Sequence, residues 1–374
     1  ARRAFAKLSG FAVALHRDGL DGQELAKAMV TMGRLDGSSR QEVVPIFRLS
    51  TVKFAHMIQT VGAQELADVA WALARFRERC PRAIEAISLA ARARIVDFGE
   101  LRLAKLAWSL TCLCVDDPAL FHAIAEEAGT KSRRLTGQDI SNLAWSFARR
   151  GADSDALLRA LAKEATSKLA SFKPQELANF AWAFARAVVK AKASLWSRLG
   201  EESSAKIAGF KQQEMSSLAW AFATLDVHHP KLFRALGHSA LRDLGASAPQ
   251  GLANLAFAYS KATLPQPTLF AAIAEASRTR LQDFKPQELA SLAWAFGKCC
   301  AVEVDLFRAI ANAALVQHES FAPQGFSNLA WAFARVRIVE RPFFRAVAVG
   351  ARARLLEFKF QEVANLCWAF ATAA

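Results

Sequence analysis

The sequence has no apolar stretch that approaches the roughly 20 residues needed to cross a bilayer as a helix, although 53% of its 374 residues are hydrophobic. It also lacks the motifs of common catalytic sites: there is no GxxxxGKS/T phosphate loop, no HExxH and no GxSxG. Its seven histidines neither recur regularly nor stand beside a candidate nucleophile. These absences argue against a membrane-spanning protein. They also mean that no residue in the sequence points to a catalytic site. We therefore expect a protein that is not an enzyme and needs no cofactor.

Cysteines are few, and their spacing is not that of a metal site. The six are Cys80, Cys112, Cys114, Cys299, Cys300 and Cys367. None belongs to a C-x-x-C motif, and no partner histidines stand at zinc-site spacing. We expect buried or loop thiols in a reducing compartment, and no bound metal.

What the sequence contains is a phrase that recurs along nearly the whole chain. Its fullest form is PQELANFAWAFAR, residues 174–186. The anchoring glutamines, spaced by 37 or 38 residues, are Gln138, Gln175, Gln213, Gln250, Gln287, Gln324 and Gln361. Looser copies begin at Gln23, Gln64 and Leu101, which makes ten repeats in all, numbered here in chain order. Repetition at this period predicts a solenoid or another repeat array.

Each repeat has the pattern of two helices. In repeat 5, Leu177, Phe180, Ala181 and Phe184 follow the i, i+3, i+4, i+7 spacing of a buried helical face. Pro174 suits the first position of this helix, which we call helix B and expect to run for about twelve residues. A second helical pattern, helix A, precedes helix B; in repeat 8 it comprises Leu269, Phe270, Ile273, Ala274 and Leu281. No window alternates like a strand. Because one hairpin is too small to bury its own apolar face, we expect an all-α solenoid of about ten stacked hairpins.

We expect the solenoid to form a single repeat domain over residues 1–374. Residues 1–60 are irregular, and Pro45 is expected to interrupt a helical pattern there. Regular repeats occupy about residues 61–374, and the last one is truncated. The chain begins at Ala1 and stops inside repeat 10, so we expect a fragment or a processed chain. A targeting peptide and a further C-terminal domain therefore stay open.

The chain is strongly basic, with 48 Lys and Arg against 34 Asp and Glu, a net charge of +14 and a pI near 9.9. Such a balance favours a polyanionic partner, most often nucleic acid. Opposite the apolar face of helix B, four positions (i, i+4, i+7 and i+11 from the anchor) share one side of the helix. We call these positions the helix B stripe.

The i+4 position of the stripe carries short amide or hydroxyl side chains in seven repeats: Asn142, Asn179, Ser217, Asn254, Ser291, Asn328 and Asn365. The i+7 position carries an aromatic ring in nine repeats: Trp71, Trp108, Trp145, Trp182, Trp220, Phe257, Trp294, Trp331 and Trp368. The i+11 position is basic in seven repeats: Arg34, Arg75, Arg149, Arg186, Lys261, Lys298 and Arg335. A single-stranded RNA reader needs such a set, because cations neutralise phosphates, amides and hydroxyls meet base edges, and rings stack on bases.

Each position also has a structural interpretation. The rings can wedge one repeat against the next, the glutamines can bond the interhelical loop, and the Asn or Ser side chains can cap or bridge neighbouring repeats. Basic residues at a helix C-terminus complement the helix dipole without any ligand. A second basic row near the end of helix A competes for a strand: Arg94, Lys131, Lys168, Lys206, Arg280 and Arg354. Because seven basic residues stand in register in a cationic chain, we favour phosphate contact at i+11, next to the Asn and Ser positions.

The recurring PQELANLAWAFA-like phrase, at its period of 37 residues, resembles the heptatricopeptide repeat, a relative of the octotricopeptide repeat. It is also similar to the leucine-rich helical region of FAST-kinase-like proteins. The resemblance covers about residues 20–374 and implies organellar RNA binding: transcript stability, processing, translation or rRNA assembly in a mitochondrion or, alternatively, a plastid. Proteins of this group often end in a RAP domain, which nothing in this sequence matches. No kinase motif is present either.

We therefore expect a single-stranded RNA-binding solenoid whose partners are organellar mRNA or rRNA and other ribonucleoprotein components, with no membrane and no metal. The main alternative is a protein-interaction scaffold or a structural subunit of a ribonucleoprotein particle. A third hypothesis is the binding arm of an enzyme whose catalytic domain lies beyond residue 374.

Overall fold

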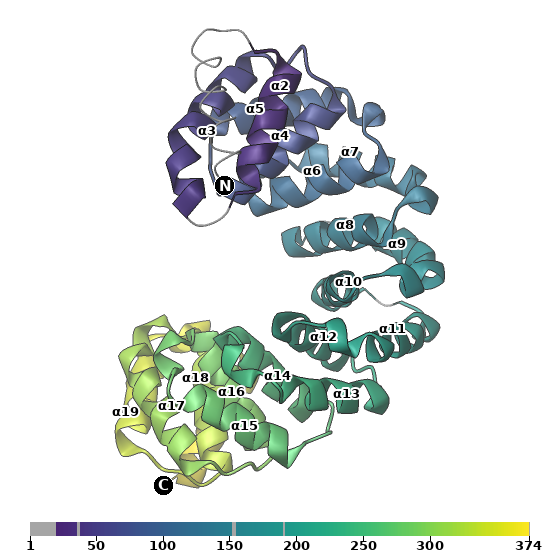
Figure 1. The fold of residues 1–374 in the computed structure, drawn as a ribbon. Helices are drawn as coiled ribbons and strands as arrows, with labels where there is room; N and C mark the ends of the chain where they lie inside the picture. Colours follow the sequence, from purple (N-terminus) through teal and green to yellow (C-terminus); the bar gives the residue numbers. More distant parts are fainter. Residues whose placement is uncertain (1–19, 36–37, 152–154, 190, 374) are drawn as a thin grey trace. The chain divides into compact units, whose positions relative to one another are not determined.

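The computed structural model describes residues 20–35, 38–151, 155–189 and 191–373, and among these residues it contains helices and loops but no strand (Figure 1). The helix B elements are α2 (Gly22–Gly33), α4 (Ala63–Phe76), α6 (Glu100–Cys112), α8 (Gly137–Arg150), α10 (Pro174–Ala187), α12 (Gln212–Thr224), α14 (Pro249–Lys261), α16 (Pro286–Lys298), α18 (Pro323–Arg335) and α20 (Phe360–Ala373). The helix A elements are α3 (Ser38–His56), α5 (Pro81–Ala93), α7 (Pro118–Thr130), α9 (Asp155–Lys168), α11 (Ala193–Ala205), α13 (Pro230–Ala240), α15 (Pro267–Arg278), α17 (Val304–Val316) and α19 (Arg341–Ala353).

The described chain falls into two compact units. The N-terminal unit contains α2 to α9, and the C-terminal unit contains α10 from Leu177 onward together with α11 to α20. Inside each unit, helix B elements of consecutive repeats pack side by side in one layer, and helix A elements form a second layer. This arrangement confirms the predicted all-α solenoid. The expectation of a single domain stays a prediction.

The Glu of the repeated phrase explains where helix B begins. Three residues into α16, the Glu288 carboxylate accepts a hydrogen bond of 2.9 Å from the Lys285 N–H, which precedes the helix. Glu214 accepts an equivalent bond from the Lys211 N–H in α12. Such a bond satisfies an amide that the helix itself leaves free. The glutamate is therefore a structural residue, whereas the glutamine beside it points to solvent in each repeat that has one.

Helix B also ends in a recurring way. From α4 to α18, a residue just beyond the helix has a positive φ: Arg77, Cys114, Gly151, Val188, Asp226, Thr263, Cys300 and Arg337. After α4, the Glu78 N–H donates to the Leu73 carbonyl at 3.1 Å, which is the bond of a Schellman motif. Only one of these eight residues is glycine, so the other seven hold a conformation that L-residues seldom adopt.

The expectation that Pro45 interrupts a helix is wrong. α3 runs from Ser38 to His56 with Pro45 inside it. Proline removes one amide donor from a helix, but Pro45 is exposed, whereas Phe47 and Phe54 on the same helix are fully buried. Phe47 stacks on Phe76 of α4, with ring centroids 3.9 Å apart. We attribute the continuity of α3 to this packing.

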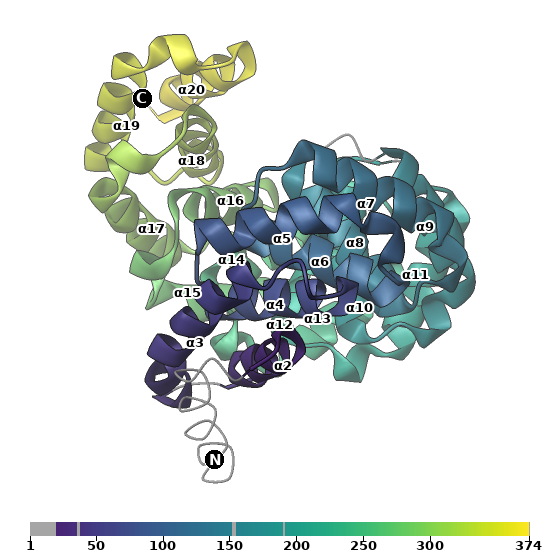
Figure 2. The ribbon, with the colours of Figure 1, turned by 90° about the horizontal axis from the view of Figure 1, so that it is seen from above.

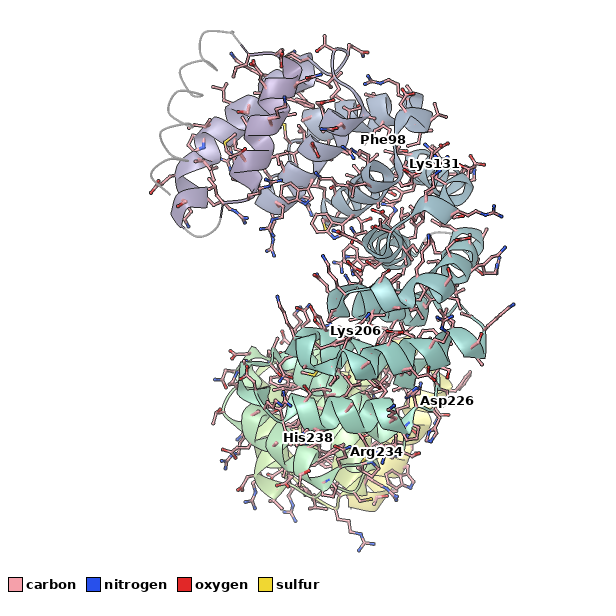
Figure 3. All side chains as sticks on the ribbon, turned by 45° about the vertical axis from the view of Figure 1, so that its right-hand side comes forward. Phe98, Lys131, Lys206, Asp226, Arg234 and His238 are labelled. Carbon is pink, nitrogen blue, oxygen red and sulfur yellow. The ribbon has the colours of Figure 1, made fainter. Side chains whose placement is uncertain are left out.

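The second basic row is used by the fold. Lys131 donates its ammonium protons to the carbonyls of Val96 and Phe98 in the preceding repeat, at 3.1 and 2.7 Å (Figure 3). Arg94, Lys168, Arg280 and Arg354 make the same kind of bond to carbonyls of the repeat before them. The carbonyls that accept these bonds lie in the loop between helix A and helix B of the preceding repeat. These cations therefore link a hairpin to the one before it. The row is therefore a weaker competitor for phosphate than the sequence suggested.

Candidate nucleic-acid interface

The helix B stripe lies on the accessible side of helix B in both units. All seven predicted base-reading residues are half-buried: Asn142, Asn179, Ser217, Asn254, Ser291, Asn328 and Asn365. The predicted phosphate-binding residues Arg34, Arg75, Arg149, Arg186, Lys298 and Arg335 are exposed, and Lys261 is half-buried. The stripe forms because its four positions lie opposite the apolar positions that pack each helix B into the core. The roles assigned to these residues stay predictions.

In the C-terminal unit the stripe is hollowed into a groove of about 620 Å³ along α14, α16 and α18, which we call the helix B groove. Asn254, Ser291 and Asn328 line it, together with Gln287 and Gln324. Among the described residues, none of these five side chains has a hydrogen-bond partner. A partly exposed amide or hydroxyl that makes no bond within the protein can bond a ligand in place of solvent. The helix B groove is thus lined by donors and acceptors that a ligand can satisfy.

A row of aromatic rings, which we call the ring wall, runs along the stripe in this unit, and three of its rings line the helix B groove: Trp220, Phe257 and Trp294. The ring centroids of Phe257 and Trp294 are 5.4 Å apart, and those of Trp294 and Trp331 are 6.4 Å apart. Trp331 and Trp368 repeat the 6.4 Å spacing. The rings therefore pack between neighbouring repeats, as the structural interpretation expected. They are only half-buried, except for Trp368, which is 42% exposed, so part of each ring is left for a ligand.

The basic row runs beside these rings. The Lys298 ammonium lies 5.0 Å from the centroid of Trp294 on its own helix, and in the N-terminal unit the Arg149 guanidinium lies 5.3 Å from Trp145. Both distances are within the range of cation–π attraction. Lys261 differs, because its ammonium donates to the Thr224 carbonyl at 3.2 Å. The Lys261 ammonium is therefore partly occupied by a hydrogen bond to the preceding repeat.

Repeats 2 and 3 fill the same positions differently. Asp68 and Lys105, at i+4 in these two repeats, form an ion pair with each other. The Lys105 ammonium also lies 5.1 Å from the Trp71 ring centroid. Arg102 donates to the side-chain oxygen of Gln64 at 2.7 Å. In these two repeats the polar side chains of the stripe therefore already bond to one another.

The helix B groove also contains a cation that was not predicted from the sequence. Lys285, just before α16, lines the groove. Equivalent lysines, all exposed, precede helix B in three other repeats: Lys173, Lys211 and Lys359. The signal was present in the sequence, two residues before the anchoring glutamine. It was missed because the stripe was defined on the helix alone.

The thiols show no sign of a shared site. All six cysteines are free. Burial raises the pKa of the Cys299 thiol, while a hydrogen bond to Ser260 and the charge of Lys298 oppose the shift. Within the described residues, no three His, Cys, Asp or Glu side chains gather as a metal site would require. In the same part of the chain, no helix has the length and apolarity to span a membrane.

Comparison with known proteins gives one informative match. No curated protein matches the chain. A solved structure titled "Homology model of the full-length AP-3 complex in an intermediate open conformation" is similar with a TM-score of 0.32 and 9% identity. That match covers 94% of this chain and 66% of the other, which is less than two thirds. The family model described as RNA-editing substrate-binding complex 6 protein matches residues 12–230 and 248–373, most of the sequence. The chain therefore belongs to the family of RNA-editing substrate-binding complex 6 proteins.

Proposed function

We propose that the chain binds single-stranded RNA and holds bases in the helix B groove. The observation that carries this proposal is the set of half-buried, unpartnered side chains at Asn254, Ser291 and Asn328, repeated along one groove beside aromatic rings. Amides and hydroxyls can bond base edges, and helical-repeat RNA readers use about one base per repeat. Only unpaired bases can present those edges in this way, so duplex RNA is a poor ligand.

Phosphates would lie along the cationic borders of the groove. Lys298 lies against the Trp294 ring, Arg335 follows Trp331 by one turn on α18, and Lys285 lies just before α16. Part of each ring of Phe257, Trp294 and Trp331 is left accessible for stacking, since the rings are only half-buried. Base–aromatic stacking contributes about 1–3 kcal/mol per base and tolerates any base. In this mechanism rings and cations supply affinity, and the amide and hydroxyl positions supply selectivity.

The family name supports this proposal and extends it to partners, because it refers to a substrate-binding complex for RNA editing. We infer a role in organellar RNA metabolism, within a complex of RNA and proteins. The resemblance to heptatricopeptide, octotricopeptide and FAST-kinase-like proteins supports transcript stability, processing, translation or rRNA assembly as that role. It also supports a mitochondrial location, with a plastid as the alternative. The chain itself is proposed to catalyse no reaction, as the missing catalytic motifs suggest.

Fluorescence anisotropy with labelled RNA tests the groove. We expect the full chain to bind a mixed-sequence single strand, and to bind the same sequence as a duplex much more weakly. Replacing Asn254, Ser291 and Asn328 together by Ala should weaken binding by a factor on the order of 100, at about 1 kcal/mol for each lost hydrogen bond. The Asn312→Ala variant is the matched control, since Asn312 is exposed on α17, outside the groove. Equal affinities for the triple variant and the control would reject the groove as the base site.

The salt dependence of the same binding tests the basic row. Seven phosphate contacts predict a slope of about −5 for log affinity against log salt, at roughly 0.7 per contact. Replacing Arg149, Arg186, Lys298 and Arg335 by Ala should flatten the slope by about 3. An unchanged slope would remove the basic row from the phosphate path. If the chain binds RNA weakly under all conditions, the scaffold hypothesis takes precedence.

A further inference from the structure

A second groove lies in the helix A layer of the C-terminal unit. It has a volume of about 530 Å³ and is lined by residues of α17, α19 and the loop after α17. These two helices are the helix A elements of consecutive repeats, and Figure 2 shows them side by side. We call it the helix A groove. Its lining shares no residue with the helix B groove. The RNA-binding proposal does not use it.

Two arginines on α19 border the helix A groove without a counter-ion. Arg341 is the first residue of α19 and Arg345 follows one turn later, so both lie on one helix face near the positive end of the helix dipole. Like charges at i and i+4, and cations at this end of a helix, destabilise it. The neighbouring Glu340 forms an ion pair with Arg308, at 3.5 Å. Among the described residues, no carboxylate pairs with Arg341 or Arg345.

The rest of the lining is mainly apolar. Leu315, Ala346 and Val349 line the groove, and Val349 is 63% exposed. Val316, at the end of α17, is 86% exposed. Val349 lies one turn beyond Arg345 on the same face of α19, so the charged and apolar parts form one continuous strip. A strip of this kind matches a ligand that carries carboxylates next to aliphatic side chains.

We propose that the helix A groove binds an acidic amphipathic helix of a partner protein. Carboxylates at i and i+4 of that helix would each accept paired hydrogen bonds from Arg341 and Arg345, because guanidinium and carboxylate groups fit in a fork geometry. Its aliphatic face would cover Leu315 and Val349, and a helix fits between two neighbouring helices as ridges fit grooves. His318 and Pro342 complete the lining. RNA fits less well, since a strand would find only His318 and the two arginines to contact and would leave Leu315, Ala346 and Val349 uncovered.

Selection from a displayed library of helical peptides on the purified full chain tests this proposal. We expect the selected peptides to carry Asp or Glu pairs at i and i+4 beside Leu or Ile. Labelled versions of those peptides should bind the Arg341→Glu, Arg345→Glu double variant at least about tenfold more weakly, because charge-assisted hydrogen bonds become repulsions. The anisotropy of each labelled peptide is the measurement.

The matched control is the Lys231→Glu, Arg234→Glu double variant on α13. It changes the net charge by the same amount on another helix A, where both residues are exposed and Arg234 occupies the repeat position of Arg345 (Figure 3). Peptide binding should be unchanged in this control, and neither variant should melt at a lower temperature than the parent chain. Selection of basic or uncharged peptides, or equal weakening in both variants, overturns the proposal. Loss of single-stranded RNA affinity only in the α19 variant would assign the groove to RNA instead.

Discussion

Repeats 2 and 3 place the same helix B positions on the surface as repeats 8 and 9, but with opposite outcomes. Asp68 and Lys105 neutralise each other across two adjacent helices. Ser291 and Asn328, at the equivalent positions, line an open groove without partners among the described residues. The backbone is the same in both places, so the side chains at i+4 decide whether neighbouring repeats satisfy one another or leave their polar groups to a ligand.

The largest expected effect comes from moving the ion pair into the groove. The Ser291→Asp, Asn328→Lys double variant recreates the Asp68 and Lys105 arrangement in repeats 8 and 9. RNA affinity should fall about 30-fold, at about 1 kcal/mol for each of the two base contacts that are lost. Anisotropy measures the affinity. The fold should persist, since partly exposed ion pairs change stability by at most about 1 kcal/mol. If a folded variant binds RNA with unchanged affinity, Ser291 and Asn328 do not contact bases.

The ring wall gives the next effect. Trp331→Ala should weaken single-stranded RNA binding about tenfold, in line with the 1–3 kcal/mol of one base stack. Trp71→Ala is the matched change in repeat 2, where Lys105 already lies against the ring, so its affinity should change by less than about threefold. Both variants lose packing, and a thermal melt separates that loss from the loss of binding. Equal affinity losses in the two variants would make the rings purely structural.

Helix B ends offer a comparison of stability between the two units. Gly151 in the N-terminal unit and Val188 in the C-terminal unit hold the same left-handed position, at φ values of 67° and 55°. Gly151→Val should destabilise the fold by about 1–2 kcal/mol, and Val188→Gly should stabilise it by about 1 kcal/mol. Chemical denaturation followed by circular dichroism measures both. Changes of the same sign in the two variants would contradict the assigned backbone conformation.

The smallest effect is expected from removing the Asp68 and Lys105 ion pair, so that the i+4 positions of repeats 2 and 3 are free for a ligand. The Asp68→Ser, Lys105→Asn double variant gives repeats 2 and 3 the side chains of repeats 8 and 9. Stability should fall by about 0.5–1 kcal/mol as the ion pair is lost, and RNA affinity should rise by no more than about threefold. Denaturation and anisotropy provide the two measurements. A decrease in affinity would show that Lys105 already contacts RNA.

The sequence determined the fold well because the helical period and the proline positions recur. Pro174 begins α10 as expected, and the stripe residues lie on one accessible face because the opposite face is uniformly apolar. What the sequence could not show is which side chains meet across adjacent helices. The Asp68 and Lys105 pair and the bonds of Lys131 depend on the register between repeats, which no single helix pattern contains. Pro45 was misjudged because burial of Phe47 and Phe54 outweighs one missing amide bond.

The cations that tie each hairpin to its predecessor also bear on how the chain folds. Arg94 and Lys131 reach carbonyls only 33 to 36 positions earlier in the sequence. Ties this local mean that closing each loop costs little chain entropy, which favours rapid folding. Structure can then start at any hairpin pair and spread to its neighbours in both directions. Until the preceding hairpin has formed, the basic side chain that bonds to it would stay solvated. Folding of that hairpin would then order the side chain.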